Sequence, residues 1–310
     1  MPPPPQTSPN PDSSSLPLDQ SHVLLTSFNS FLTVAIHNIL YYRNIYPPAT
    51  FLSTRAYNLP VHQNRHPKVC AWILDAVDAV SAQLSTGHVS RIAIVIHSPL
   101  NHPFPPPPQS KSQSQTPSQS PKQSLRPGSV LERWLVDTSR FPTWPDSSNM
   151  PTAASTSKAM HDFSRVLAKE SRTEDARDTL LLADTDALRW PDLDEQLRGA
   201  LQRMASVAER MAPLPEGCTF TVAVELDEEG RAPIGHPQPW IPSEPNLQPA
   251  NASKGQDGDD IGGVKTRPIR SVEAGPLFFE CWVEEGQAKE VLMRMLQGDK
   301  GASQLSTQPF

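Results

Sequence analysis

Three segments of the chain repeat apolar residues at spacings of three and four, which is the period of an α-helix. In the first, residues 22–46, apolar residues cover more than one side, so we predict a central buried helix that the following Pro-Pro pair ends. The second begins at Pro67 and ends before Gly87. The third begins at Pro191, where acidic residues complement the helix dipole. The pattern therefore predicts three helices.

Short β-branched runs lie between these helices. Residues 91–97 form a continuous apolar run that is typical of a buried strand, and residues 130–136 fit its hairpin partner. Residues 219–226 alternate between apolar and polar side chains, which predicts a strand with one buried face. A last strand is predicted from Leu277 to Val283. The elements together predict an α+β fold, with three helices packed on a mostly antiparallel sheet.

Composition limits how much of the chain joins this core. With 35 prolines and only 37% hydrophobic residues, the 310 residues do not supply two full cores. We expect one domain over residues 21–298, flanked by disordered tails at 1–20 and 299–310. Two long disordered insertions are expected to interrupt the domain, a Pro/Ser/Gln-rich loop at 99–128 and a second segment at 141–187.

Charge and cysteine content exclude several classes of function. The net charge of −6 gives no general attraction to a phosphate backbone, which argues against strong direct binding of nucleic acid. Three scattered cysteines do not form a disulfide framework and fit a reducing compartment. The N-terminus lacks the pattern of a signal peptide, and the longest apolar run is interrupted by polar residues. We expect an intracellular protein without a membrane segment.

The residues that can support catalysis do not form a convincing set. His62 and His66 have the spacing of a helical metal site, but prolines flank them and no cysteine or carboxylate cluster accompanies them. Cys218 lies at the entry to a predicted strand, where a packed thiol is more common than a nucleophile. The sequence also lacks the glycine-rich patterns that bind phosphates. We therefore predict no enzyme activity, no metal and no cofactor.

Several sequence blocks resemble the HORMA-domain family. They follow the family's order once the two insertions are set aside, and together they cover a little over half of the chain. The blocks are FLTVAIHNILY (31–41) with Tyr46-Pro47, YNLPV (57–61), His66-Pro67, PEGCTFTV (215–222) and PWI (239–241). Within the family, they look most like the accessory, non-catalytic subunit of DNA polymerase zeta.

This resemblance implies a peptide clamp. In such proteins the segment after the central sheet, here residues 228–298, is a movable belt that pins an extended, proline-containing peptide beside a sheet edge. The implied partners are the catalytic subunit of DNA polymerase zeta, the scaffold deoxycytidyl transferase, a AAA+ remodelling ATPase and a second HORMA protein. The implied role is translesion DNA synthesis and DNA damage tolerance in the nucleus, with the cytoplasm as a further location.

Five residues carry over from the family's motifs. Tyr57 matches the tyrosine that contacts the bound peptide, and Trp240 matches the belt tryptophan that closes over it. Arg198 falls on the third-helix arginine of the HORMA–HORMA dimer surface. Glu280 and Trp282 fall on the surface that docks the scaffold transferase, although the charge of Glu280 departs from the family's pattern. The plainer alternatives are a packed loop tyrosine for Tyr57 and a solvated helix charge for Arg198.

Two other functions are compatible with the same sequence. A spindle-checkpoint or meiotic-type HORMA adaptor would use the same clamp for other clients. Alternatively, Phe104–Pro108 in the proline-rich loop forms a polyproline II segment that binds proline-recognition domains. The identity of the captured peptide separates the first alternative from the polymerase adaptor. Deletion of residues 99–128 separates the second, because it leaves a clamp intact.

Overall fold

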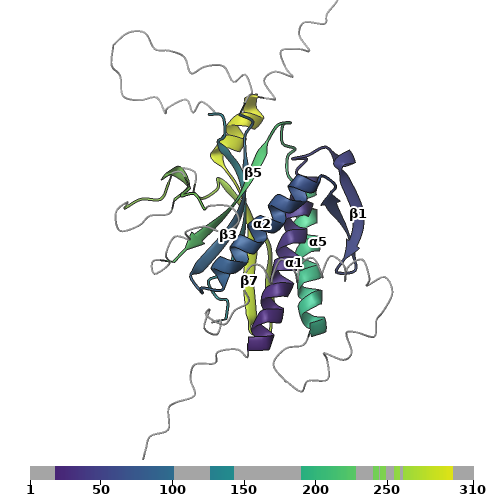
Figure 1. Cartoon of the computed structure of the whole chain (residues 1–310). Helices are drawn as coiled ribbons and strands as arrows, with labels where there is room; N and C mark the ends of the chain where they lie inside the picture. Colours follow the sequence, from purple (N-terminus) through teal and green to yellow (C-terminus); the bar gives the residue numbers. More distant parts are fainter. Residues whose placement is uncertain are drawn as a thin grey trace, which may run out of the picture.

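The computed structural model places a layer of helices between a large and a small β-sheet (Figure 1). The helices are α1 (Leu18–Tyr42), α2 (Pro67–Leu84) and α5 (Trp190–Arg210). The strands are β1 (Phe51–Ala56), β2 (Leu59–Asn64), β3 (Val89–His97), β4 (Val130–Asp137), β5 (Thr219–Leu226), β6 (Lys265–Ala274) and β7 (Leu277–Glu285). The predicted α+β fold, with helices on an antiparallel sheet, is confirmed.

The structure describes only part of the chain, namely residues 18–100, 126–142, 190–227, 240–243, 245–248, 255–258 and 261–295. Nearly all of the expected tails and of the expected insertions at 99–128 and 141–187 lies outside these residues. The expectations of disorder there stay predictions. Residues 18–20 are an exception, because they belong to α1 and not to a tail.

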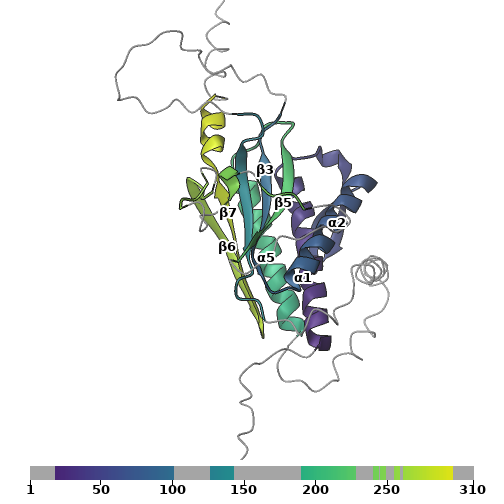
Figure 2. The same cartoon turned by 60° about the vertical axis from the view of Figure 1, so that its left-hand side comes forward.

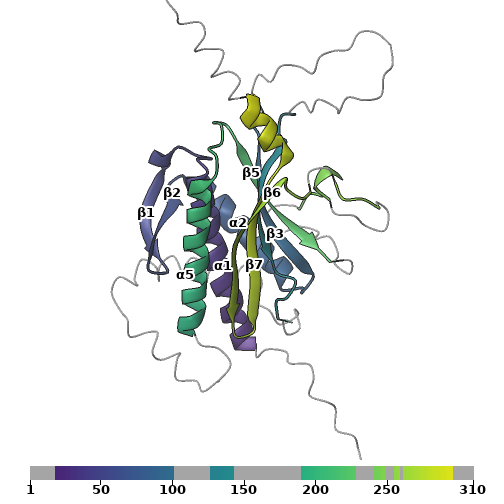
Figure 3. The same cartoon turned by 180° about the vertical axis from the view of Figure 1, so that it is seen from behind.

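The large sheet has the strand order β5-β3-β4-β7-β6, and every neighbouring pair is antiparallel. The predicted hairpin across the proline-rich loop is confirmed, since β3 and β4 pair in the register Ile94↔Trp134. Figure 2 shows the large sheet beside the helices, and the β1–β2 hairpin lies on the other side of the helices, as Figures 1 and 3 show. The C-terminal strands β6 and β7 therefore lie at the edge of the large sheet opposite to β5.

Helix α1 runs through the middle of the core. Phe28 and Phe31 are fully buried, and their rings lie 5.3 and 5.4 Å from the ring of Phe279 on β7, centroid to centroid. By length and composition the stretch Ser21–Tyr42 is apolar enough to cross a membrane, but 72% of an apolar 18-residue part of it is buried inside the protein. Packing against the sheet and two other helices identifies α1 as the core helix of the domain.

The end of α1 differs from the prediction of a helix over 22–46. The helix ends at Tyr42, before the Pro-Pro pair, because Asn44 adopts a left-handed backbone conformation with φ of 54°. The amide of Ile45 then donates a hydrogen bond to the Leu40 carbonyl at 3.0 Å and closes the last turn. Asparagine tolerates this conformation and ends helices in the way that glycine does.

Three elements were not predicted from the pattern. The β1–β2 hairpin turns through Tyr57 and Asn58, which have φ of 50° and 57° as in a two-residue type I′ turn, but without the usual glycine. The pattern does not predict strand β6, because Pro268 and a bulge interrupt its alternation and most of its side chains are exposed. A helical segment over residues 287–295 follows β7 and contributes Leu292 to the core.

Two buried polar residues of α1 attach the β1–β2 hairpin. The amide of His62 donates to Asn38 Oδ1 at 2.9 Å, and the amide of Asn64 donates to His37 Nδ1 at 3.3 Å. His37 accepts this bond only with Nδ1 unprotonated. Burial lowers the pKa of His37 from 6.5 to about 4, so the ring is neutral at physiological pH.

Acid is expected to destabilise the protein through His37. Because its folded pKa is depressed, the contribution of His37 is complete above pH 6.5 and is lost as pH falls towards 4. Between pH 7.5 and pH 5 this amounts to about 2 kcal/mol of unfolding free energy. Urea unfolding of wild type and His37→Asn at both pH values measures it. The difference between the two proteins removes the contributions of Asp78, whose pKa burial raises to about 6, and of His62. Equal pH dependence in both would contradict the prediction.

Candidate functional site

Strand β5 forms one edge of the large sheet. It pairs with β3 from Val89↔Leu226 to His97↔Thr219, and no described strand pairs with its other side. The predicted apolar face does point to the core, where Phe220, Val222, Val224 and Leu226 pack, but these side chains are half-buried and not buried as predicted, because the strand lies at the sheet edge. Such an edge presents free main-chain donors and acceptors to an extended segment of another chain.

Half-buried aromatic side chains gather at the start of this edge. The ring of Phe220 lies 5.0 Å from Trp72 of α2 and 6.4 Å from Tyr46, centroid to centroid and edge to face. Sequence reasoning did not single out Trp72 or Tyr46 as site residues. In the sequence, Trp72 stands next to the apolar stripe of α2 but is not part of it, which could have marked it as a candidate contact residue. That pattern alone does not show which strand Trp72 contacts.

The chain between β5 and β6 contacts both faces of the sheet. It leaves one edge and returns at the opposite edge, across four strand spacings or about 19 Å. Trp240 is half-buried against the main core on the helix side. Leu247, in the 3-10 turn η3 (Pro245–Leu247), packs on the other face against a cluster of Ala93, Val95, Val130 and Leu135. In Figures 1 and 3 the part of this segment around the 3-10 turn lies on the side of the sheet away from the helices.

The two residues expected to contact a peptide both lie at the margin of the main core. Tyr57 forms the first position of the β1–β2 turn, and its hydroxyl group lies 3.5 Å from the Ser27 carbonyl oxygen of α1. Trp240 precedes Ile241, whose side chain is 85% exposed. Trp240 belongs to no described helix or strand, so its position depends on the segment around it.

Arg198 lies on the accessible side of α5. Its guanidinium forms an ion pair with Glu195 one turn earlier, which raises the pKa of Arg198 through the hydrogen bond and the negative charge. Next to it, Arg270 of β6 crosses the helix at Gly199, where an added Cβ would lie 3.1 Å from the guanidinium. Arg270 also donates to Gln196 Oε1 at 2.8 Å. The surface around Arg198 is therefore shared by α5 and β6.

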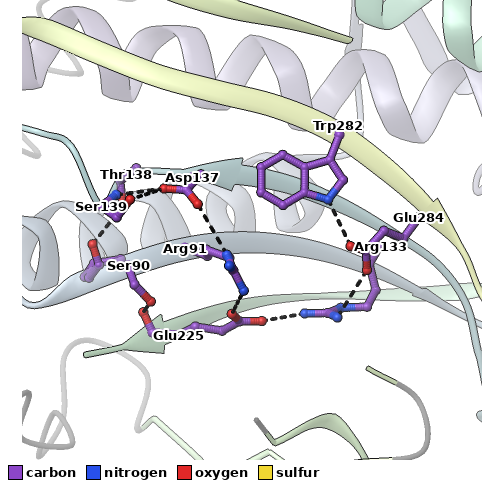
Figure 4. A network of polar contacts seen from close by, with 10 residues as sticks. Ser90, Arg91, Arg133, Asp137, Thr138, Ser139, Glu225, Trp282 and Glu284 are labelled. Carbon is purple, nitrogen blue, oxygen red and sulfur yellow. Dashed lines mark hydrogen bonds and ion pairs between the residues drawn. The ribbon is translucent and has the colours of Figure 1, made fainter. Parts of the chain in front are cut away.

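Trp282 and Glu280 lie two residues apart on β7, on the face of the sheet away from the helices. Trp282 is half-buried, and its Nε1 donates to Glu284 Oε1 at 2.9 Å. Arg91 lies over its ring at 5.9 Å from the centroid (Figure 4). Glu280 is exposed and faces Asp137 of β4 in the register.

The same face carries a network of ion pairs that fixes Trp282. Arg133 is buried and bonded to both Glu225 and Glu284, and Arg91 contacts Glu225 at 3.2 Å (Figure 4). The network joins β3, β4, β5 and β7. These contacts orient the Trp282 side chain, so that the Nε1 side of its ring faces Glu284, which is itself bonded to Arg133.

A HORMA domain match covers residues 25–267, which is most of the chain and includes most of α1 and all of α2, α5 and β5. The chain belongs to the HORMA-domain family. Its fold is the HORMA fold, as the sequence blocks predicted. The match ends within β6, so strand β7 and the helical segment 287–295 extend beyond it.

Relatives within the HORMA family carry two kinds of name. The DNA polymerase zeta processivity subunit of Schizosaccharomyces pombe is 27% identical over 260 residues, covering 83% of this chain and 91% of that protein. The mitotic spindle assembly checkpoint protein MAD2B of Gallus gallus is 34% identical over 86 residues, 28% of this chain and 41% of the relative. Among solved structures, a chain of the Mitotic Checkpoint Complex aligns with a TM-score of 0.48 and 16% identity, over 86% of this chain and 98% of that one.

HORMA-domain proteins are non-catalytic adaptors. Cys218 and His62, which the sequence offers for catalysis or metal binding, pack against neighbouring side chains. Burial, with a smaller contribution from Glu132, raises the pKa of the Cys218 thiol to about 11, so it is protonated and a poor nucleophile. His62 stacks on Tyr41, with 3.5 Å between ring centroids. Within the described residues, no three His, Cys, Asp or Glu side chains are grouped to hold a metal ion.

Proposed function

We propose that this HORMA protein captures an extended, proline-containing peptide of a partner along the outer edge of β5, under the belt (residues 228–298). The observation that carries the proposal is the edge itself. It is unpaired within the described structure, while the chain that follows must return to the opposite edge of the sheet. A peptide beside β5 completes the ladder on one side, and the returning segment covers it.

The belt has two parts with different anchoring. Residues 265–285 form the β6–β7 hairpin, which is held in the sheet by the ladder between β4 and β7. Residues 228–264 connect β5 to this hairpin and contact the sheet at Trp240 and Leu247. A peptide under such a loop leaves only when the loop opens, so trapping slows dissociation much more than it speeds association.

The partner that we propose is the catalytic subunit of DNA polymerase zeta, and the role is translesion DNA synthesis. The name of the relative that aligns over most of both chains supports this choice. The MAD2B relatives favour a second candidate, a checkpoint client, although they align over a much smaller part of this chain. Both candidates use the same clamp and differ in the captured peptide.

Peptide capture tests the proposal. Fluorescent proline-containing segments of the polymerase zeta catalytic subunit, scrambled versions of them, and segments of checkpoint proteins are titrated against the full chain by anisotropy. Wild type is expected to bind the polymerase segment with slow dissociation and to ignore its scrambled form. Preferential binding of a checkpoint segment selects the second candidate, and binding of neither contradicts the clamp.

The edge geometry has its own control. Methylating alternate backbone nitrogens on the side of the peptide that faces β5 removes main-chain donors without changing a side chain. Binding is expected to fall by one to two orders of magnitude, since each lost hydrogen bond costs about 1 kcal/mol and leaves a β5 acceptor unpaired. A peptide methylated on the opposite set of nitrogens is the matched control. Equal binding by both would show that β5 is not the docking edge.

The remaining residues have proposed roles around this clamp. We propose that Arg198 contributes to a dimer surface with another HORMA protein, which the oligomeric state of Arg198→Ala measures. We propose that Glu280 and Trp282 contribute to the docking surface for the scaffold deoxycytidyl transferase, which binding by Trp282→Ala measures. Action of a AAA+ ATPase on the belt, and location in the nucleus, also stay proposals.

A further inference from the structure

A fully buried carboxylate joins the helices to the sheet. Glu132 of β4 accepts two hydrogen bonds from Arg43, at 3.0 Å to Nε and 2.6 Å to Nη2, and one from Trp134 Nε1 at 3.1 Å. Arg43 also donates to the carbonyl oxygens of Ala208 and Ala212 at the end of α5. Glu132 and Arg43 are 0% and 2% exposed, so this pair belongs to the permanent core.

A second carboxylate gathers the end of the belt. Glu285, the last residue of β7, accepts a hydrogen bond from Arg267 Nε of β6 at 2.7 Å. Its carbonyl oxygen accepts the amide of Val264, the residue that ends the connecting part of the belt, at 2.9 Å. Burial alone would raise the pKa of Glu285, but hydrogen bonds from Lys289 and Arg267 outweigh it and lower the pKa. Glu285 is therefore ionised, and it is bonded both to Arg267 of β6 and to Val264, the residue before β6.

One side chain bridges these two carboxylates. Lys289, in the helical segment 287–295, places its Nζ 2.6 Å from Glu132 Oε1 and 2.6 Å from Glu285 Oε2. Lys289 is 2% exposed, and Leu292, one turn later, is 1% exposed in the main core. At the start of the segment, the amide of Gly286 donates to the Leu131 carbonyl at 2.8 Å, and a Cβ there would lie 2.6 Å from the Val130 carbonyl oxygen.

We infer that Lys289 and the segment 287–295 form a C-terminal latch, which fastens the β6–β7 hairpin to the core and so sets how long a trapped peptide stays under the belt. The inference rests on the proposed clamp. Lys289 is a positioning residue, because it is buried and acts through Glu132 and Glu285. When the hairpin separates from β4, Glu285 moves with it and Glu132 stays, so Lys289 must release one of the two.

Lys289 is also the member of the cluster that can be removed cleanly. Without it, Arg43 still neutralises Glu132 and Arg267 still neutralises Glu285, so no buried charge is left without a partner. Lys289→Met keeps the length and the apolar stem of the side chain. A matched control exists on the same segment, since Arg294 pairs only with Glu290 among the described residues and its side chain is 77% exposed.

Two measurements on the full chain test the latch. The first is the dissociation rate of the fluorescent polymerase segment. Lys289→Met is expected to release it about tenfold faster than wild type, because it lacks the one charge-assisted hydrogen bond that must break when the hairpin separates, and Arg294→Met is expected to match wild type. The second is amide hydrogen exchange. Exchange in β7 is expected to speed up in Lys289→Met, while exchange between β3 and β5 is unchanged.

Unchanged release and unchanged exchange in Lys289→Met would overturn the latch, and so would equal acceleration in all strands, which marks a general loss of stability. If Lys289→Met does not fold, Lys289→Gln, which keeps one donor, is measured in its place with a smaller expected change. If wild type captures no peptide, the proposed function fails, and the exchange measurement still tests whether Lys289 holds the hairpin.

Discussion

Glu132→Gln is expected to lower the free energy of unfolding by about 3–5 kcal/mol, the largest stability effect of any single change considered for this protein. The substitution keeps the shape of the side chain but removes the negative charge that Arg43 and Lys289 share at 2.6 Å. Both cations are then buried beside a neutral amide, and the amide directs a donor towards them. Urea unfolding at pH 7.5, followed by circular dichroism, measures the loss.

Two further variants show whether the loss comes from the buried cluster. Glu290→Gln removes a carboxylate that is half-exposed and bonded only to Arg294 in the described contacts, and it is expected to change the unfolding free energy by less than about 1 kcal/mol. In the double variant Glu132→Gln with Lys289→Met, the second change removes a cation that has lost one of its two carboxylates and faces a neutral amide, so the loss is expected to be smaller than the sum of the two. Additive losses would contradict the shared site.

Trp240→Ala is expected to weaken peptide capture by at least about 30-fold, mainly through faster dissociation. Trp240 is half-buried against the main core, although it belongs to no described helix or strand. Its removal therefore opens the belt where the belt meets the core, and it leaves the sheet and the helices in place. Anisotropy with the polymerase segment gives the dissociation rate, and circular dichroism reports whether the domain still folds.

The specificity of this effect is tested by two companions. Trp240→Phe keeps an aromatic ring against the core and is expected to recover most of the capture. Leu52→Ala removes an exposed apolar side chain from β1, on the far side of the helices, and is expected to bind as wild type does. Undiminished capture by Trp240→Ala would remove Trp240 from the site. Equal weakening by Leu52→Ala would indicate a general effect of apolar surface.

The variants Glu132→Gln and Trp240→Ala test the stability of the fold and the capture of the peptide separately. Glu132 fixes the relation of α1, α5 and β4, which every function of the fold requires. Trp240 is needed only if the belt closes over a ligand. The proposed function predicts that Glu132→Gln loses stability but still captures the peptide without denaturant. It also predicts that Trp240→Ala loses capture but keeps its stability.

Local patterns predicted the elements whose side chains repeat with a clear period. The apolar stripes of α1, α2 and α5 and the run of β3 are such cases, because burial against one face selects residues at fixed spacing. The β1–β2 hairpin and β6 were missed for the opposite reason. One turns through Tyr57 and Asn58 without glycine, and the other is an edge strand with exposed side chains and an internal proline.

The candidate site was predicted in part. Tyr57, Trp240, Arg198, Glu280 and Trp282 came from matching sequence blocks, and their roles stay predictions that the experiments above test. Trp72 and Tyr46, which meet Phe220 at the β5 edge, were not found, because they come from separate elements that only the fold brings together. Lys289 was also missed, since a lysine near the C-terminus of a sequence resembles any solvated charge.

By itself the sequence determined the family, the α+β class and the stripes that fill the core, because these depend on residue type and on spacing along one segment. The tertiary structure decided which strand edge is left unpaired and which buried charges meet. Strand order is set by long-range pairing, and the β6–β7 hairpin beside β4 leaves β5 open. The bridge from Glu132 through Lys289 to Glu285 spans 157 positions between its first two members. No local pattern records such a contact, since it exists only when packing removes the three side chains from water together.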